Sequence, residues 1–292
     1  MFQIVSDSAC DFTKEEAQKY DIGVVPFYVV FDQESVLKEG VDITREDYFQ
    51  RLLSDKKKFP KTSQPNPQDY IDIFTPYLKE GRDILTLTIS SKLSGSGQSA
   101  KIAAETLKKE YPDRTVKVVD SLSGSVGQGL ILREIIKMRD AGYTLEQTVQ
   151  MAEKVLGTTK LYCTVDSLEY ARRGGRIGPA TALVGSILGL HPILHMLAGE
   201  VLQLDSVRGK KKVLKLIEEA VVDAIKDAKE EISLGVGHIL KEAEALSFKA
   251  SIEEALGIEI IPISEIGVTI GTHAGPGGLI VAYCKKYEAL CN

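Results

Sequence analysis

Small polar residues follow expected strands at three places along the chain. Ser6-Asp7-Ser8 and Asp120-Ser121 each end an apolar run, and Ser94-Gly95-Ser96-Gly97 opens an expected helix. Hydroxyl and glycine residues at a helix start leave backbone N–H groups accessible, and the partial positive charge there favours an anion. The pattern therefore indicates an anion site, with simple helix capping by Ser94 as the structural alternative.

His273 is the histidine with the best access for a ligand. It stands in the glycine-rich segment 271–278, ahead of the last expected strand. Glycines on both sides let a ligand approach closely, which makes His273 a candidate functional residue as well as a candidate structural one. We expect His191, His195 and His238 to be structural.

Other signatures of catalysis are missing from the sequence. There is no GxxxxGK[ST] and no GxGxxG after the first strand, and Gly95-Ser96-Gly97 lacks the GxSxG spacing of a nucleophile elbow. The four cysteines are scattered without a CxxC pair, so we expect reduced thiols, and no metal or other cofactor. Asp7 and Asp11 could imitate a metal-binding pair, but a turn with a cap is the simpler interpretation.

Composition is that of an ordinary globular chain. The 292 residues include 36 Lys and Arg against 41 Asp and Glu, a net charge of −5, and 43% are hydrophobic. This balance argues against disorder and against nucleic-acid binding, which needs a basic face. The first residues show no secretory signal, so we expect a cytoplasmic protein.

Residues 177–199 carry no charged side chain and have about the length of a bilayer span. Pro179 and Pro192 interrupt the stretch, so we expect a buried helix followed by a buried strand instead. Two basic clusters flank it, Arg172-Arg173-Gly174-Gly175-Arg176 and Arg208-Gly209-Lys210-Lys211-Lys212. Each is either a solvated face or a docking site for an anionic partner.

The elements that must position these residues alternate along the chain. Strands are expected at 3–6, 24–31, 83–89, 115–119, 160–165, 232–238, 259–263 and 279–284, with most connections helical. Such alternation predicts the α/β class with mainly parallel sheets. Because the pattern restarts near Gly157, we expect two α/β domains, 1–157 and 158–292, with a ligand cleft between them.

These motifs occur in the order of a known family. They are Ser6-Asp7-Ser8 with Asp11, Thr62-Ser63-Gln64-Pro65, Ser90-Ser91-x-Leu93-Ser94-Gly95-Ser96, Asp120-Ser121, Leu168-Glu169-Tyr170 with Gly174-Gly175-Arg176-Ile177, Pro192-Ile193-Leu194 and His273-x-Gly275-Pro276-Gly277. Together they resemble the DegV family, and within it the fatty-acid-binding subunit of bacterial fatty acid kinase (FakB). The resemblance spans about residues 4–284.

The resemblance implies a carrier that is not itself an enzyme. A long-chain fatty acid would lie between the domains, its carboxylate held by Thr62, Ser94 and His273, with Ser63 and Gly95 beside them and Ser121 and Gly275 as further contacts. A separate ATP-dependent kinase subunit would phosphorylate the carboxylate to an acyl phosphate, and Arg173 and Arg208 would contact the kinase or the phosphate. The carrier would touch a membrane surface transiently.

The acyl tail would need an apolar tunnel. The uncharged stretch is the best candidate for its lining, through Leu183, Ile187, Leu188, Ile193, Leu194 and Met196, although plain core packing explains the same residues. Two other functions stay open: a self-contained serine hydrolase that uses Ser94 and His273, and a lipid sensor without a kinase partner.

Overall fold

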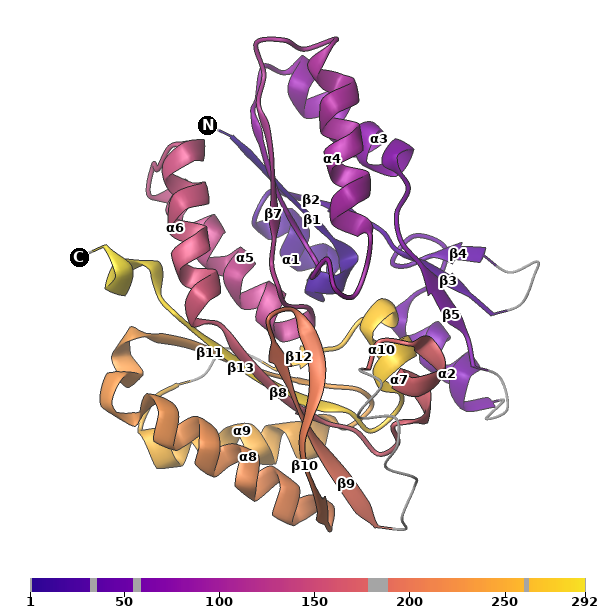
Figure 1. Cartoon of the computed structure of the whole chain (residues 1–292), viewed down its shortest axis with the longest axis vertical. Coiled ribbons are helices and arrows are strands. Elements are labelled where there is room, and N and C mark those ends of the chain that lie inside the picture. The colour runs from indigo at the N-terminus through magenta and orange to yellow at the C-terminus, as the bar shows by residue number, and fades with distance from the viewer. Residues whose placement is uncertain (1, 32–35, 55–58, 178–188, 260–262, 292) are drawn as a thin grey trace.

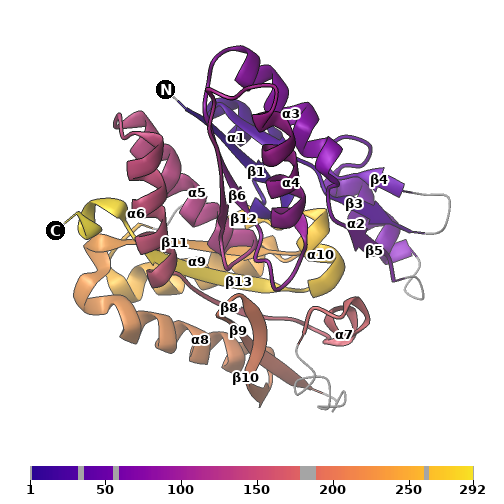
Figure 2. The same cartoon turned by 45° about the horizontal axis from the view of Figure 1, so that its top comes forward.

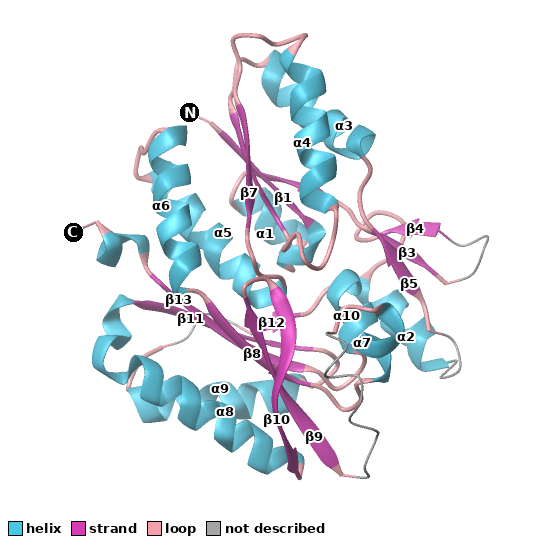
Figure 3. Cartoon of the chain, in the orientation of Figure 1, coloured by secondary structure: helices cyan, strands magenta, loops and turns pink. Residues whose placement is uncertain are grey.

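The computed structural model describes residues 2–31, 36–54, 59–177, 189–259 and 263–291. Two large sheets, one small sheet and the helices around them make up this part of the chain (Figures 1 and 3). The expected α/β class is confirmed. The helices are α1 (Lys14–Lys19), α2 (Arg45–Ser54), α3 (Pro67–Lys79), α4 (Ser96–Lys108), α5 (Ser125–Asp140), α6 (Leu145–Thr158), α7 (Glu169–Gly174), α8 (Lys210–Ile225), α9 (Glu242–Leu256) and α10 (Val268–Ala274).

The first sheet is parallel throughout, as expected. Its strand order is β2-β1-β6-β7, with β1 at Gln3–Asp7, β2 at Ile22–Val25, β6 at Ile84–Thr88 and β7 at Val116–Asp120. Every residue of β1 and β6 is buried, because α3 and α4 pack on one face while α1 and α5 pack on the other.

A small antiparallel sheet was not foreseen. It has the order β4-β3-β5, with β3 at Tyr28–Val30, β4 at Val36–Lys38 and β5 at Lys61–Ser63. The single strand expected at 24–31 is wrong: β2 ends at Val25 and β3 starts at Tyr28. Pro26 lies between them and cannot donate a ladder hydrogen bond, so the chain changes sheets there.

The second large sheet corrects the expectation of mainly parallel pairing. Its order is β10-β9-β8-β13-β11-β12, with β8 at Lys160–Thr164, β9 at Leu190–Leu197, β10 at Glu200–Arg208, β11 at Ile232–His238, β12 at Ser264–Glu265 and β13 at Leu279–Lys285. Among the described strands of this sheet, only the β11–β12 pair is parallel.

Two connections explain the antiparallel pairing. Ala198 and Gly199 both have positive φ, 48° and 86°, and form a two-residue turn that joins β9 and β10 into a hairpin. The second connection is α10, which joins β12 to β13. β12 ends beside the end of β11, and β13 begins at this same end of the sheet, with Leu279 opposite His238. The chain therefore runs back beside β11 instead of crossing over.

Helix α5 lies between the two large sheets (Figure 2). It is buried on almost every side, which is why its sequence shows little amphipathic pattern. One cluster of buried side chains extends from Ile4 and Leu87 of the first sheet through Ile131 to Ile280 of the second. Helices α8 and α9 cover the outer face of the second sheet. The division into 1–157 and 158–292 stays a prediction.

The strand expected in the uncharged stretch is present as β9, whose residues Ile193 and Leu194 are buried. The expected helix falls on 178–188, outside the described residues. Among the helices that the structure describes, none is long and apolar enough to cross a bilayer.

Candidate functional site

Three residues from distant parts of the chain meet at one cavity between the two large sheets. Thr62 comes from β5, Ser94 from the loop before α4, and His273 from the last turn of α10. The cavity has a volume of about 130 Å³. Most of its wall is apolar, formed on one side by Leu161, Cys163, Leu194, Met196, Val201 and Ile280, and on the other by Phe27, Ile89, Leu93 and Ile270.

Thr62 and His273 contact each other directly. The Oγ1 of Thr62 is 2.8 Å from Nε2 of His273. Burial, helped by the positive charge of Arg176, lowers the pKa of His273 to about 4, so the imidazole is neutral at pH 7. A neutral imidazole and a hydroxyl can each donate a hydrogen bond to an acceptor placed between them.

His273 lies on a helix and not in the glycine-rich loop expected from the sequence. Two glycines set its surroundings: a Cβ on Gly174 would be 2.1 Å from Nδ1 of His273, and one on Gly275 would be 2.3 Å from the Tyr170 ring. Gly275 has a φ of 74° and ends α10. It is not among the residues that line the cavity, and in this structure it turns the chain at the end of α10. Its contact with a ligand stays a prediction.

The loop that carries Ser94 combines capping with access to the cavity. The Ser94 hydroxyl accepts a hydrogen bond from the Ser96 amide at 3.2 Å, which leaves its own proton free to point elsewhere. The Gly95 amide donates to Oε1 of Gln64 at 2.8 Å and is therefore occupied. Gln64, which sequence reasoning passed over, lines the cavity beside Ser94.

The buried carboxylate of Asp7 is hydrogen-bonded to both ends of this loop, at Ile89 and Ser96. Asp7 accepts hydrogen bonds from the Ser96 hydroxyl at 2.7 Å, the Ile89 amide at 3.0 Å and the Gln128 side chain at 2.9 Å. Burial raises the pKa of Asp7 to about 6. The Ser6-Asp7-Ser8 motif is therefore part of the support for the Ser94 loop.

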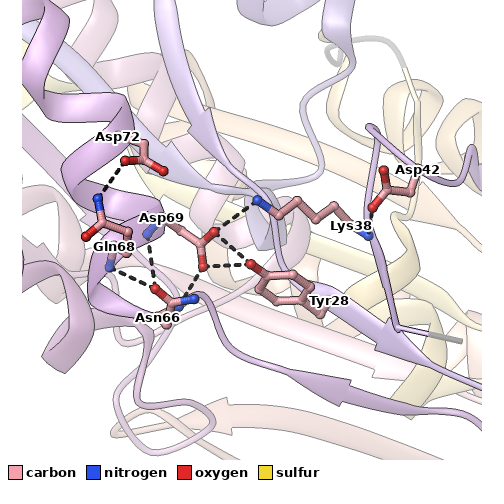
Figure 4. Close-up of polar contacts among 7 residues, drawn as sticks. All are labelled: Tyr28, Lys38, Asp42, Asn66, Gln68, Asp69 and Asp72. Carbon is pink, nitrogen blue, oxygen red and sulfur yellow. Dashed lines mark hydrogen bonds and ion pairs between the residues drawn. The ribbon is translucent and has the colours of Figure 1, made fainter. Parts of the chain in front are cut away.

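A second polar network lies between α3 and the small sheet that contains β5 (Figure 4). The carboxylate of Asp69, in the first turn of α3, accepts hydrogen bonds from the Tyr28 hydroxyl at 2.7 Å and from Lys38 Nζ at 3.1 Å. It also accepts from the Asn66 amide at 2.9 Å. Tyr28 lies on β3 and Lys38 on β4, so the network joins α3 to the small sheet. Because β3 pairs with β5, Tyr28 opposite Ser63, the strand that carries Thr62 belongs to the same sheet.

Ser63 and Ser121 were also expected near the ligand. Neither lines the cavity. Ser121 donates its hydroxyl to the Ser123 carbonyl at 3.0 Å and shapes the turn before α5. Ser63 points away from the cavity because neighbours on a strand face opposite sides, and Thr62 takes the inner side.

The predicted tail contacts divide into three groups. Leu194 and Met196 line the cavity from β9. Ile193 does not line the cavity: it belongs to the cluster on the opposite face of the sheet, with the α8 side chains Val213 and Ile217. Its contact with a tail stays a prediction. Leu183, Ile187 and Leu188 lie outside the described residues.

A second cavity borders the same Thr62–His273 pair. It has a volume of about 320 Å³ and shares Thr62, His273 and Arg176 with the first. Lys61 and Arg173 also line it.

The arginines differ in their relation to these cavities. Arg173 is paired with Glu169 at 2.5 Å, and its guanidinium lies 3.9 Å from the Phe59 ring centre. Arg176, which the sequence analysis did not single out from its cluster, lines both cavities. Arg208, at the end of β10, lines neither.

In the part of the chain that the structure describes, neither a grouped set of metal ligands nor a partner for the second ring nitrogen of His273 is present. Within the described residues, no group of three His, Cys, Asp or Glu side chains could hold a metal ion. The Nδ1 of His273 is buried without a hydrogen-bond partner among them, whereas a Ser-His hydrolase needs a third group that orients the imidazole through that atom.

Comparison with known proteins gives a consistent result. A family model described as "Uncharacterised protein, DegV family" matches residues 1–286. A DegV domain-containing protein of Clostridium perfringens is 32% identical over 286 residues, which cover 97% of each chain.

Solved structures agree in fold over nearly the full length. A stearic-acid-binding protein from Eubacterium ventriosum superposes with a TM-score of 0.93 at 32% identity, covering 99% of this chain and 100% of the other. A DegV family protein from Thermus thermophilus, described as fatty acid binding, gives a TM-score of 0.86 at 30% identity, covering 97% and 99%.

Proposed function

Because this chain belongs to the DegV family, we propose that it binds one long-chain fatty acid in the cavity, with the carboxylate at Thr62, Ser94 and His273. The observation that carries the proposal is the cavity itself. It is apolar along most of its wall and polar where these three side chains converge. The fatty acids bound by the Eubacterium and Thermus proteins support the same ligand class here.

The head group suits the polar end. A buried carboxylate is costly unless several donors surround it. Two hydroxyls and a neutral imidazole supply such donors, and Arg176 adds a positive charge at the edge of the cavity. A carboxylate that enters between Thr62 and His273 replaces their mutual 2.8 Å contact with two bonds to its oxygens.

The tail suits the apolar wall. Burial of hydrocarbon contributes about 0.8 kcal/mol per methylene, so a chain of roughly fifteen methylenes gains on the order of 12 kcal/mol. Association and the ordering of the chain offset part of this gain.

The finer proposal is that the bound acid is presented to a separate ATP-dependent kinase subunit. A carboxylate oxygen would attack the γ-phosphorus of ATP, ADP would leave, and an acyl phosphate would remain on the carrier. The second cavity supports this role, because Thr62 and His273 line it together with Lys61, Arg173 and Arg176. Cations at this place favour a group with more negative charge than the carboxylate.

We place this carrier in the cytoplasm, in transient contact with a membrane surface from which it takes its ligand. Leu197 and Leu204, at 52% and 57% exposure, support such a contact from the β9–β10 hairpin. Other residues of this hairpin line the cavity. A lipid sensor without a kinase would share the cavity, and only the phosphorylation assay below separates it.

Native mass spectrometry of the protein purified from cells tests the binding step. We expect an added mass equal to one long-chain fatty acid, lost on denaturation and identified after solvent extraction. A bare chain mass under gentle conditions contradicts the proposal. For the finer step, the loaded protein, ATP and a fatty acid kinase subunit should yield acyl phosphate, and its absence with an active kinase would favour the sensor.

A further inference from the structure

Helix α10 comes from the second half of the sequence but packs against elements of the first half. It follows β12 of the second sheet in the chain, yet it packs against α2, β3 and β5, which belong to the first half of the sequence (Figure 1). Thr269, Ile270, His273 and Ala274 form the side of α10 that faces the cavity. Whatever fixes the first turn of α10 therefore also fixes the place of His273.

Glu39 holds that first turn. Its Oε1 accepts a hydrogen bond from the Val268 amide at 2.5 Å. Its Oε2 accepts from the Thr269 hydroxyl at 2.6 Å and from the Thr269 amide at 3.3 Å. A carboxylate at the start of a helix satisfies amides that have no partner within the helix.

Glu39 is itself fixed to the first half of the chain. Its Oε2 also accepts from the Ser8 hydroxyl at 2.7 Å, and Ser8 accepts from the Phe27 amide at 3.0 Å. Glu39 is only 8% exposed. Within the described residues its carboxylate oxygens are contacted by hydroxyl and amide donors and not by a lysine or arginine.

The packing around α10 leaves little room for adjustment. A Cβ on Gly267 would be 2.5 Å from Oε1 of Glu39, and one on Gly271 would be 2.6 Å from the Phe49 ring. At the other end of the helix, Nε2 of His273 is 2.8 Å from Thr62. A small shift at the first turn is therefore passed along the helix to this contact.

We propose that Glu39 is a positioning residue for the carboxylate site: by holding the first turn of α10, it sets the place of His273 against Thr62. The identity of the ligand, a fatty acid carboxylate, rests on the proposed function. The effect of Glu39 on the position of His273 does not depend on that function. Substitution by glutamine removes the charge and turns an N–H donor toward groups that are themselves donors.

The test compares Glu39→Gln with Glu134→Gln. Glu134 is the control, because it is another buried carboxylate that accepts from a hydroxyl, Ser233 at 2.7 Å, and an amide, Tyr287 at 3.0 Å. It differs from Glu39 in its ion pair with Lys137 at 2.7 Å, and it does not line the cavity. We expect Glu39→Gln to weaken palmitate binding by delipidated protein at least about tenfold. Glu134→Gln should lower the melting temperature and leave the affinity unchanged.

A double-variant cycle separates positioning from general damage. In a His273→Ala background, Glu39→Gln should cause little further loss of affinity, because the group it positions is gone. Equal losses in both backgrounds, or full affinity of the Glu39→Gln single variant, would overturn the proposal. If Glu39→Gln does not fold, Ser8→Ala removes one of its donors and should weaken binding several-fold in the same direction.

A ligand-free measurement keeps this inference distinct from the proposed function. The ring ¹⁵N signals of His273 should move in Glu39→Gln and stay in place in Glu134→Gln. Unchanged signals in Glu39→Gln overturn the positioning role even if palmitate binds to no variant. A wild-type protein that binds no palmitate, with the signals moving as expected, defeats the proposed function alone.

Discussion

Gly174 offers a direct way to disturb the head-group site without changing any side chain in it. A Cβ at this position would be 2.1 Å from Nδ1 of His273, whereas ordinary van der Waals contacts begin at 3.4 Å. In Gly174→Ala the imidazole therefore has to move away by about 1.3 Å, the difference between these two distances. The contact of 2.8 Å with Thr62 cannot survive such a movement, because hydrogen bonds of this kind weaken beyond about 3.2 Å.

The expected effect follows from one lost donor at a buried carboxylate. Such a loss costs about 1–3 kcal/mol, or roughly a 5- to 150-fold rise in Kd. Isothermal titration of delipidated protein with palmitate measures it.

Gly157→Ala is the control. Gly157 lies near the end of α6, where a Cβ would meet nothing within 4 Å. This variant should bind as tightly as wild type and be slightly more stable, since alanine favours a helix. A folded Gly174→Ala protein with wild-type affinity would refute the assigned place of His273 in the site.

Three further outcomes are expected. Ser94→Ala and Thr62→Val each remove one hydroxyl donor and should each raise the Kd for palmitate about tenfold in the same titration; full acyl phosphate formation by the double variant would show that the head group lies elsewhere. Because the pKa of His273 is lowered to about 4, the folded state resists protonation, so its contribution to stability is complete above pH 6.5 and is lost as the pH falls towards 4. Urea unfolding should show this loss in wild type and not in His273→Gln, and identical pH profiles would contradict the buried neutral imidazole. Arg176→Gln should weaken palmitate binding several-fold and slow acyl phosphate formation more strongly, whereas Arg208→Gln, outside both cavities, should leave the Kd unchanged; equal effects on affinity would contradict the placement of Arg176.

Part of the fold could be read from local sequence patterns. In the first sheet, β1 and β6 are short runs buried at every residue and separated by helices, which is typical of parallel strands covered on both faces. In the second sheet β13 lies between helices on both faces of the sheet and shows the same pattern of burial. Periodicity reports burial and does not report strand direction, which is why the antiparallel pairing of β13 was missed.

Helix α10 shows a different limit. Its seven residues include Gly271, and Gly267 and Gly275 flank it, so its intrinsic helix propensity is low. The glycines are explained by neighbours far away in the chain: Phe49 packs against Gly271 and the Glu39 carboxylate against Gly267. Such packing overrides local propensity and cannot be read from the segment alone.

The set of residues that form the candidate site could not be predicted from local sequence patterns alone. The residues alone indicated an anion near Ser94 and a candidate role for His273, but nothing local joins Thr62 to His273, which lie 211 positions apart. The family resemblance supplied that pairing. Arg176 was passed over because an arginine cluster usually forms a solvated face, and only the structure separates it from Arg173 and Arg208.

The most direct test of the account is a crystal structure of the protein as purified from cells. We expect continuous density for one acyl chain along Leu161, Leu194 and Met196, ending in a carboxylate within hydrogen-bond distance of Thr62, Ser94 and His273. A chain bound with its carboxylate away from these three side chains, or side chains that fill the space between the sheets, would contradict the account.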